Sequence, residues 1–178
     1  NAVYLGDASF GLGRDYYQKE SPKNAETIAE YKKYVAKVLT EIGYKNADAV
    51  AGQIVDFEKK MAKTLLTNEQ IRDANLQYNP KTLPELKTLV KNVNLAKYLT
   101  DAGVNTDKVI IGELNYYKNL DTFLTEKNIP LIKDYLKFHL TSGSASYLNQ
   151  KMDDIKFDFY SKYLQGQKEQ RALNKRAL

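Results

Sequence analysis

Very few residues in this sequence could support metal chemistry. Of its 178 residues, one is histidine (His139) and none is cysteine. Zinc sites draw their ligands mainly from these two residue types, and a helical HExxH site needs two histidines four residues apart together with a glutamate. A zinc centre of this kind therefore cannot be assembled from this chain alone.

His139 is the one candidate for a general base that titrates near neutral pH. Three serines follow it closely in sequence: Ser142, Ser144 and Ser146. A Ser–His nucleophilic pair is therefore conceivable. However, His139 lies between Tyr135 and Leu140 on the apolar side of a predicted helix. This position favours an interior, hydrogen-bonded histidine, because a catalytic pair is defined by geometry and not by proximity in sequence.

Three aspartates lie close together further along the chain: Asp153, Asp154 and Asp158. Their spacing is similar to that of aspartate-rich helices that hold magnesium and diphosphate, but Phe157 stands where the next acid is needed. Lysines on either side, including Lys156, partly neutralise the cluster. A solvated helix face therefore explains these residues better than a metal site does.

Glu58 interrupts an apolar stripe, since it lies four residues after Ile54 and four before Ala62. A carboxylate that faces a core must be paired or hydrogen-bonded, because an isolated buried charge costs several kcal/mol. Arg14 and Arg72 are the predicted partners. The alternative is a catalytic acid, but no second carboxylate lies in matching register. A structural ion pair is the favoured interpretation.

Composition excludes several classes of function. The net charge is +5, and the five charged residues from Lys168 to Arg176 contribute +3, which leaves only +2 for the remainder. This is too little for a nucleic-acid-binding surface. The sequence has no apolar run long enough to span a bilayer and no signal-peptide pattern. Because the chain begins with Asn1 and reaches Leu178 without a helix stop signal, we expect a piece of a larger protein.

The sequence predicts that most of the segments carrying these residues are helices. Residues 1–20 show no helical period and predict an extended lead. Ser21-Pro22 predicts the start of a helix that ends at Gly43, and Asn46 the start of a second that reaches Leu65. The short connection between them indicates an antiparallel helical hairpin.

The second half of the chain predicts shorter helices and one long one. A capping box at Thr67/Gln70 predicts a short turn that ends near Arg72-Asp73, and a second at Thr82/Glu85 predicts a short helix to about Leu89. Further helices are predicted over 94–102, 113–126 and 130–143, and a six-turn helix over 144–164 with the apolar stripe Ala145, Leu148, Met152, Ile155 and Phe159. Residues 109–111 are β-like but favour a buried linker.

The predicted fold class is all-α, an irregular multi-helix domain with antiparallel helical hairpins and at most one very short strand. One domain is expected over 1–178. It comprises the extended lead (1–20), a helical body (21–165) and the start of a linker helix toward a missing catalytic domain (166–178).

A succession of short motifs resembles the neprilysin-type family of zinc metallopeptidases, which includes endothelin-converting enzyme and bacterial oligoendopeptidase O. The structural signature is Arg14, Asp15, Tyr16 and Tyr17, with Glu58 further on. The other matching motifs, in order, are Gly11-Leu12-Gly13, Tyr34-Val35 with Leu39, Phe57 with Ala62, Arg72-Asp73, Tyr78-Asn79, Tyr135 to Leu140, Tyr147-Leu148, Phe157 with Phe159, and Gly166 with Arg171, Lys175, Arg176, Ala177 and Leu178. The resemblance covers nearly the whole chain.

The resemblance implies that this segment is the smaller helical domain that closes over a catalytic domain elsewhere in the same chain. It would wall off a chamber that admits oligopeptides and excludes folded proteins. In this reading the family's zinc ligands lie beyond residue 178, so the segment carries no catalytic, metal or cofactor residue, is inactive alone, and depends on zinc in the parent enzyme.

Two other interpretations stay open at this stage. One is a stand-alone helical module that binds peptides or proteins through its tyrosines, without catalysis. The other is an enzyme that uses His139 or the aspartates around Asp153. Absence of cysteine favours the bacterial cytoplasm, with a secreted or membrane-anchored parent as the alternative.

Overall fold

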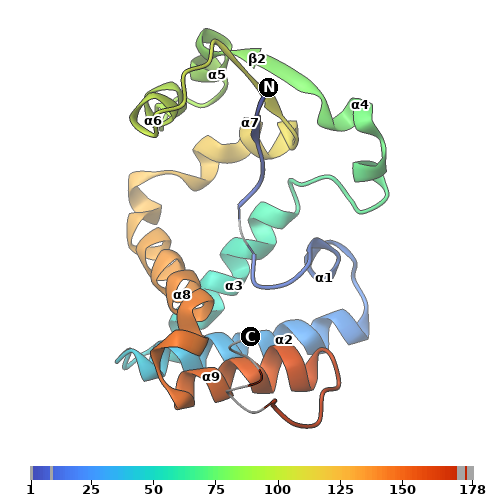
Figure 1. The fold of residues 1–178 in the computed structure, drawn as a ribbon, viewed down its shortest axis with the longest axis vertical. Helices are drawn as coiled ribbons and strands as arrows, with labels where there is room; N and C mark the ends of the chain where they lie inside the picture. The colour runs from blue at the N-terminus through green and yellow to red at the C-terminus, as the bar shows by residue number, and fades with distance from the viewer. Residues whose placement is uncertain (1, 9, 172–174, 176–178) are drawn as a thin grey trace.

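The computed structural model of the chain describes residues 2–8, 10–171 and 175. Within them, helices dominate, and a small sheet lies at the end of the molecule opposite α2 and α9 (Figure 1). The helices are α1 (Arg14–Gln18), α2 (Pro22–Glu41), α3 (Ala47–Ala62), α4 (Ala74–Gln77), α5 (Leu83–Leu89), α6 (Leu95–Asp101), α7 (Leu114–Phe123), α8 (Ile129–Leu148) and α9 (Gln150–Lys156). Short 3₁₀ turns at Gln70–Arg72 and Glu126–Asn128 and a π-helix at Phe157–Tyr163 complete the helical structure.

The predicted all-α class is confirmed. None of the helices in the described residues combines the length and apolarity that a bilayer crossing requires.

The predicted helical hairpin is formed by α2 and α3. Ser21 begins α2 by accepting a hydrogen bond from the Asn24 amide at 3.1 Å, and Pro22 follows at the first helical position. The connection after α2 contains Gly43 at a φ of +93°, a conformation that favours glycine. The two helices bury their apolar faces, including Val35, Val38, Leu39, Val50, Ile54 and Met61. This pair supplies the frame on which the polar residues of the core are placed.

The boundary between α8 and α9 differs from the prediction. We expected one helix to end at Gly143 and the next to begin at Ser144, but α8 passes through both residues to Leu148. The break falls at Asn149, whose side chain accepts a hydrogen bond from the Met152 amide at 2.9 Å. Gly143 does not stop the helix because a glycine with helical angles costs only about 1 kcal/mol there. Asn149 is as good an N-cap as serine.

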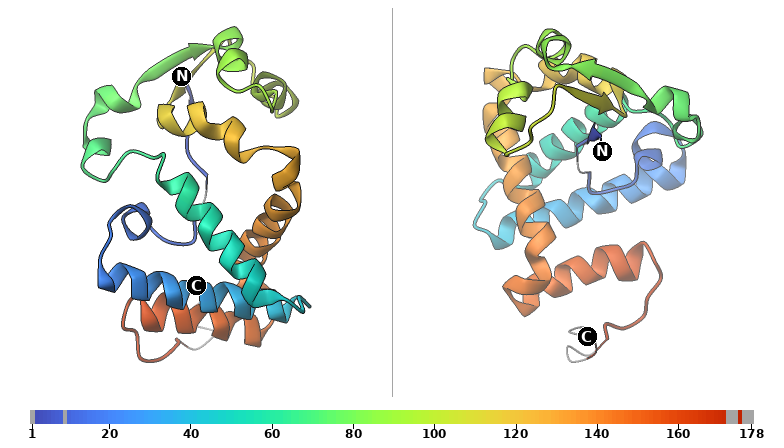
Figure 2. Two further views of the ribbon diagram at one scale, coloured as in Figure 1. Left: turned by 180° about the vertical axis from the view of Figure 1, so that it is seen from behind. Right: turned by 45° about the horizontal axis from the view of Figure 1, so that its top comes forward.

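The predicted apolar stripe of this region is buried at only some of its positions. Ala145, Met152 and Phe159 are buried, whereas Leu148 is 54% exposed. The reason is the break at Asn149, which turns α9 away from the axis of α8. In Figures 1 and 2, α9 runs alongside α2, where Phe159 stacks on Tyr34 with ring centroids 5.1 Å apart.

The β-like residues 109–111 are not a linker. They belong to β3 (Lys108–Ile111), the centre of a three-stranded sheet in the order β1-β3-β2. β1 (Val3–Leu5) pairs with β3 in parallel, and β2 (Asn79–Thr82) pairs with it in antiparallel. The prediction of at most one strand is therefore wrong. Both edge strands are short, and β2 contains Pro80, which an edge strand tolerates but which obscures a strand pattern in sequence.

The two ends of the chain also differ from the prediction. The lead is not wholly extended, because it contains the helix α1 as well as the strand β1. At the other end, residues 166–171 follow a non-helical path after Gly166, whose φ is +70°. The linker helix predicted over 166–178 is therefore wrong for this stretch, and its remainder falls mostly outside the described residues.

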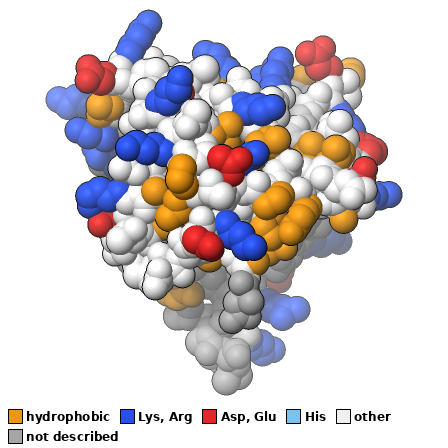
Figure 3. All heavy atoms as spheres, turned by 90° about the horizontal axis from the view of Figure 1, so that it is seen from above, with side chains coloured by type: hydrophobic (Ala, Val, Ile, Leu, Met, Phe, Trp, Pro, Cys, Tyr) orange, Lys and Arg blue, Asp and Glu red, His pale blue; other side chains and the backbone are white. Residues whose placement is uncertain are grey.

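The sheet end of the molecule has a mixed surface. Figure 3 views this end from above and shows hydrophobic groups separated by lysine, arginine and acidic side chains. Three of its apolar residues are well exposed: Tyr4, Tyr78 and Tyr98. Single exposed apolar side chains of this kind are normal and need no explanation.

The lead packs closely on the core at Gly11, which gives a stability prediction. A Cβ at this position would overlap the hydroxyl and ring carbons of Tyr31, which is fully buried. Because Tyr31 has no room to move, we expect Gly11→Ala to lower the free energy of unfolding by about 3 kcal/mol. Urea denaturation measures the change. Gly6→Ala is the matched control, because nothing lies within 4 Å of a Cβ there; equal stabilities of the two variants would contradict the prediction.

Candidate functional site

A buried polar cluster lies at the centre of the chain, where four helices each supply one side chain. Glu58, from the middle of α3, has no exposed surface. Tyr17 of α1 donates a hydrogen bond to Glu58 Oε2 at 2.6 Å, and Tyr31 of α2 donates to Oε1 at 3.1 Å. His139 of α8 places its Nε2 2.6 Å from the same Oε1. The carboxylate therefore ties α1, α2 and α8 to α3.

The surroundings keep both tyrosines protonated. Burial raises the pKa of the Tyr17 hydroxyl far above its usual value, and the charge of Glu58 raises it further. Burial is also the main reason that the pKa of Tyr31 is raised well above 10, again with help from Glu58. Two neutral phenols thus serve as permanent donors. A carboxylate with three donors is fully satisfied, which lowers the cost of burying its charge.

The partners of Glu58 are not those predicted. The sequence interpretation named Arg14 or Arg72, whereas the structure uses Tyr17, Tyr31 and His139. Glu58 faces the core as the helical pattern indicates. Its lack of exposed surface favours the structural interpretation over the catalytic acid, because no substrate can reach it without local unfolding.

Arg14 has a different task. Its guanidinium donates to Glu113 at 2.7 Å, to the Leu66 carbonyl at 2.6 Å and to Asp7 at 3.1 Å. Glu113 is itself buried and also accepts from the Leu66 amide at 2.7 Å. This second cluster ties the lead to the loop after α3 and to the start of α7. A planar guanidinium suits it, because its donors point in several fixed directions.

The structural signature Arg14-Asp15-Tyr16-Tyr17 therefore splits into inward and outward residues. Arg14 and Tyr17 each join a buried cluster, as described above. Asp15 lies near the surface and binds Lys19 at 3.3 Å, and Tyr16 is half-buried against the core. The short helix α1 thus supplies two anchors, Arg14 and Tyr17. Because they are three residues apart, they lie on the same face of the helix.

His139 is not paired with a serine. Its Nε2 meets Glu58, while Ser142, one turn further along α8, shares a hydrogen bond of 2.6 Å with the Tyr34 hydroxyl. The side chain of His139 is 19% exposed and packs on Tyr135, with ring centroids 4.3 Å apart. This geometry agrees with the interior, hydrogen-bonded histidine and gives no support to a Ser–His pair.

Loss of the His139 imidazole should weaken the fold without abolishing it. His139→Ala removes one of three donors to Glu58, and the two tyrosines remain. We expect the free energy of unfolding to fall by about 2 kcal/mol, as for a hydrogen bond to a charged group. Far-ultraviolet circular dichroism should be unchanged, and chemical denaturation measures the loss. A variant that fails to fold would show that the histidine does more than donate to Glu58.

The three aspartates of the C-terminal helices do not converge. Asp153 is buried and accepts a hydrogen bond from Gln170 at 2.9 Å, which corrects its predicted place on a solvated face. Asp154 accepts from Gln150 at 2.7 Å, and Asp158 lies 3.8 Å from Lys162. Among the described residues, no three potential metal ligands gather in one place.

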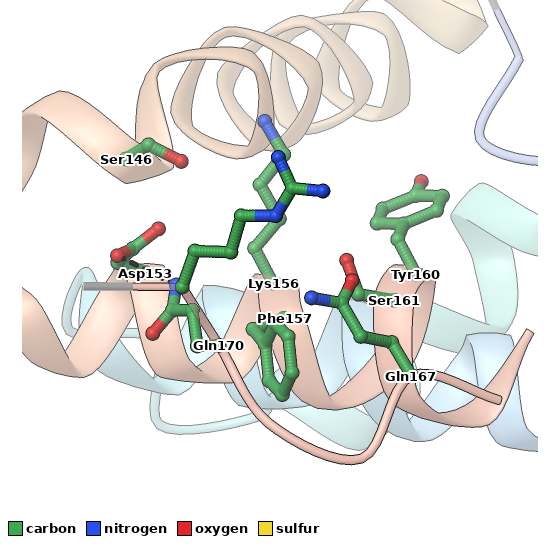
Figure 4. Close-up of a pocket in the computed structure, with 9 residues that line it drawn as sticks. Ser146, Asp153, Lys156, Phe157, Tyr160, Ser161, Gln167 and Gln170 are labelled. Atoms are coloured by element: carbon green, nitrogen blue, oxygen red, sulfur yellow. Dashed lines mark hydrogen bonds between the residues drawn. The ribbon is translucent and has the colours of Figure 1, made fainter. Parts of the chain in front are cut away.

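Asp153 lies on the wall of an open polar pocket of about 490 Å³ (Figure 4). Helix α8 supplies Ser146, and α9 with the following π-helix supplies Lys156, Tyr160 and others. Residues after the π-helix close the remaining side: Gln167, Gln170 and Arg171. These groups can donate and accept hydrogen bonds. The pocket was not predicted, because its walls come together only through the turn after Gly166.

The sequence did not predict the roles of two residues, Tyr31 and Glu113. Tyr31 was expected in the core, but its role as a donor to Glu58 was not. Glu113 was read only as the start of a helix. Its one signal was its position directly after the buried strand β3, where a carboxylate is held close to the core. Neither role follows from helical periodicity, because both depend on residues far away in sequence.

These features define a class of protein part: a helical segment whose distant elements are joined by buried polar anchors. The sequence profile of peptidase family M13 matches residues 1–178. The chain therefore belongs to peptidase family M13.

Curated relatives agree with this family. The chain is 26% identical over 164 residues to the neutral endopeptidase of Lactococcus lactis subsp. cremoris, which covers 92% of this chain and 26% of that protein. It is 25% identical over 163 residues to mouse endothelin-converting enzyme 1, covering 86% of this chain and 21% of that enzyme. The chain thus spans about a quarter of the length of these relatives.

Solved structures share the fold. The zinc metalloprotease Zmp1 of Mycobacterium tuberculosis in its open state superposes with a TM-score of 0.89 at 22% identity, covering 98% of this chain and 28% of Zmp1. PepO from Lactobacillus rhamnosis gives a TM-score of 0.79 at 20% identity, covering 98% of this chain and 28% of PepO. The fold described here therefore recurs within larger peptidases.

Proposed function

We propose that this chain is the substrate-enclosing helical domain of a neprilysin-type zinc metalloendopeptidase that hydrolyses oligopeptides. The observation that carries the proposal is the family match over all 178 residues, together with the small share of each relative that the chain represents. In this proposal the chain forms a wall, and the chemistry belongs to another part of the full-length protein.

The residues present here do not fit a zinc centre. The chain has one histidine and no cysteine, and that histidine is occupied by Glu58. The most tightly held carboxylates, Glu58 and Glu113, are bound to other side chains. We therefore assign no catalytic step to this segment and propose that it is inactive alone.

Its buried anchors suit a rigid wall. Glu58 joins α3 to three other helices, and Arg14 joins the lead to the loop after α3 and to the start of α7. Such cross-links between distant segments restrict how far the helices can separate, so the segment would move as a unit if the enzyme opens and closes. Its proposed partners are the catalytic domain of the same protein and oligopeptide substrates. Bacterial relatives support the bacterial cytoplasm as its proposed location.

Peptide hydrolysis by the full-length protein and by the 178-residue chain tests the proposal. We expect the full-length protein to cleave oligopeptides and to lose activity with a zinc chelator, and the 178-residue chain to be folded and inactive. Enclosure predicts that the same cleavage sequence is cut in a short peptide but not within a folded protein. Metal-dependent cleavage by the 178-residue chain itself, or absence of peptidase activity in the full-length protein, would overturn it.

A further inference from the structure

Helix α8 presents large apolar side chains on the side that faces away from the core. Four of them are Ile129, Leu136, Leu140 and Tyr147, with exposed fractions of 46%, 58%, 74% and 90%. They are 7, 4 and 7 residues apart, so at 3.6 residues per turn they form one line along the helix, about 27 Å long. We call this line the α8 stripe.

The opposite side of α8 is also apolar. It buries Tyr135, Phe138 and Ala145 against α2 and α3. Apolar side chains on two opposite sides are typical of an interior helix, whereas a surface helix normally has a polar outer face. The outer face of α2 follows that rule, with Lys33 exposed on it. The α8 stripe therefore has the composition of an interior surface, but no other described residue covers it.

The surface continues into a hollow at the start of α8. An open pocket of about 390 Å³ is lined there by Val93, Leu124, Ile129 and Ile132, among others. The pocket could receive a side chain from whatever covers the stripe. Aligned apolar residues next to a pocket differ from the scattered ones in Figure 3 and are typical of a docking surface.

The exposed charges on α8 beside the stripe are two lysines, and the pocket at the start of the helix is also lined by the exposed Glu126. Lys133 and Lys137 are exposed on α8. The one acidic residue of this helix, Asp134, is engaged by the Tyr44 hydroxyl at 2.5 Å. A complementary surface would thus be apolar along its centre and carry carboxylates opposite the two lysines.

We propose that the α8 stripe docks against the remainder of the full-length peptidase, on an apolar surface with carboxylates facing Lys133 and Lys137. This inference rests on the proposed function. The relatives devote about three quarters of their length to residues outside the matched region, which is ample to supply such a surface. In addition, Gln170 and Arg171 share a pocket with Ser146 of α8, so the C-terminal part of the chain passes beside this helix.

Thiol labelling at position 140 tests the docking. The 178-residue chain has no cysteine, so Leu140→Cys gives it a single reactive thiol. We expect a maleimide reagent to label this thiol at least tenfold more slowly in the full-length protein than in the 178-residue chain. Mass spectrometry identifies the labelled peptide. Lys33→Cys on α2 is the matched control, because the Lys33 side chain is 67% exposed and pairs with Glu30 on the same helix. The ratio of labelling rates at position 33 in the two proteins measures differences in thiol reactivity that do not depend on docking.

Three outcomes would overturn the inference. The first is equal labelling at position 140 in both proteins after correction by the control. The second is protection in the 178-residue chain that grows with its concentration, because the stripe would then bind a second copy. The third is protection in the full-length protein that appears only when an oligopeptide is added, because the stripe would then bind substrate.

Charge reversal gives a second readout. Lys133→Glu combined with Lys137→Glu should restore fast labelling at position 140 in the full-length protein, while Lys133→Arg with Lys137→Arg should leave it slow. If labelling at position 140 stays slow after charge reversal, the claim that the partner surface carries carboxylates opposite these lysines is wrong. Peptidase activity is measured on the same samples. In the full-length Leu140→Cys protein that keeps both lysines, fast labelling together with peptidase activity would defeat the docking inference alone, and slow labelling without peptidase activity would defeat the proposed function alone.

Discussion

Replacing Glu58 by alanine should lower the free energy of unfolding by about 4 kcal/mol. The carboxylate is completely buried and is the shared acceptor of Tyr17, Tyr31 and His139. Its loss leaves three polar groups without their acceptor and opens a cavity between four helices. Removing one partner from a buried, hydrogen-bonded charge cluster costs about 3–5 kcal/mol, because the remaining groups are buried and cannot hydrogen-bond to water instead.

Glu58→Gln separates charge from shape. The amide keeps the volume and can still accept hydrogen bonds, so we expect it to cost clearly less than alanine. Glu26→Ala on the exposed side of α2 is the control and should unfold at the same urea concentration as the unmodified chain. Equal stability of Glu58→Ala and the unmodified chain would mean that the cluster does not hold α1, α2 and α8 to α3.

Stability should collapse above about pH 10. Burial raises the pKa values of Tyr34, Tyr116 and Tyr117 to about 12, and those of Tyr17 and Tyr31 further. An unfolded tyrosine titrates near 10. Below that pH both states keep the phenolic proton, and the tyrosines leave stability unchanged. Above it the unfolded chain releases protons that the folded chain retains, so stability falls with rising pH.

The magnitude follows from the number of such groups. Each tyrosine whose pKa rises from 10 to about 12 costs about 2–3 kcal/mol of stability by pH 12. Three of them together approach the 5–15 kcal/mol that stabilises an ordinary domain. We therefore expect the chain to unfold cooperatively between about pH 10 and pH 12.

Tyrosinate absorbance measures this directly, because the chain has 14 tyrosines and no tryptophan. The buried tyrosines should ionise together with the loss of helix. Ionisation of all tyrosines in one step near pH 10, with the helices intact, would contradict the burial described here.

The hairpin and the capping boxes could be predicted because their causes are local. Ser21, Gly43 and the Thr82/Glu85 pair act on residues within one turn of themselves, so sequence alone contains the information. The sheet could not be predicted in the same way. β1 lies more than 100 residues from β3, and β2 contains a proline, so each strand is recognisable only beside the others.

The polar core shows the same limit. Helical spacing places Glu58 in the interior, and this is a local inference. Its partners come from residues 17, 31 and 139, and a search for an opposite charge led to arginines instead. Phenols and an imidazole are less obvious partners because they are neutral or partly apolar. The break at Asn149 was missed because Ser144 satisfied the same capping rule a few residues earlier.

The parallel pairing of β1 with β3 sets an order for events during synthesis. Val3 pairs with Val109, so the first strand has no partner until the ribosome has released the middle of the chain. The α2–α3 hairpin can assemble long before that. β1 must therefore remain unpaired at first, and sheet closure becomes a late step that depends on how quickly the polypeptide emerges.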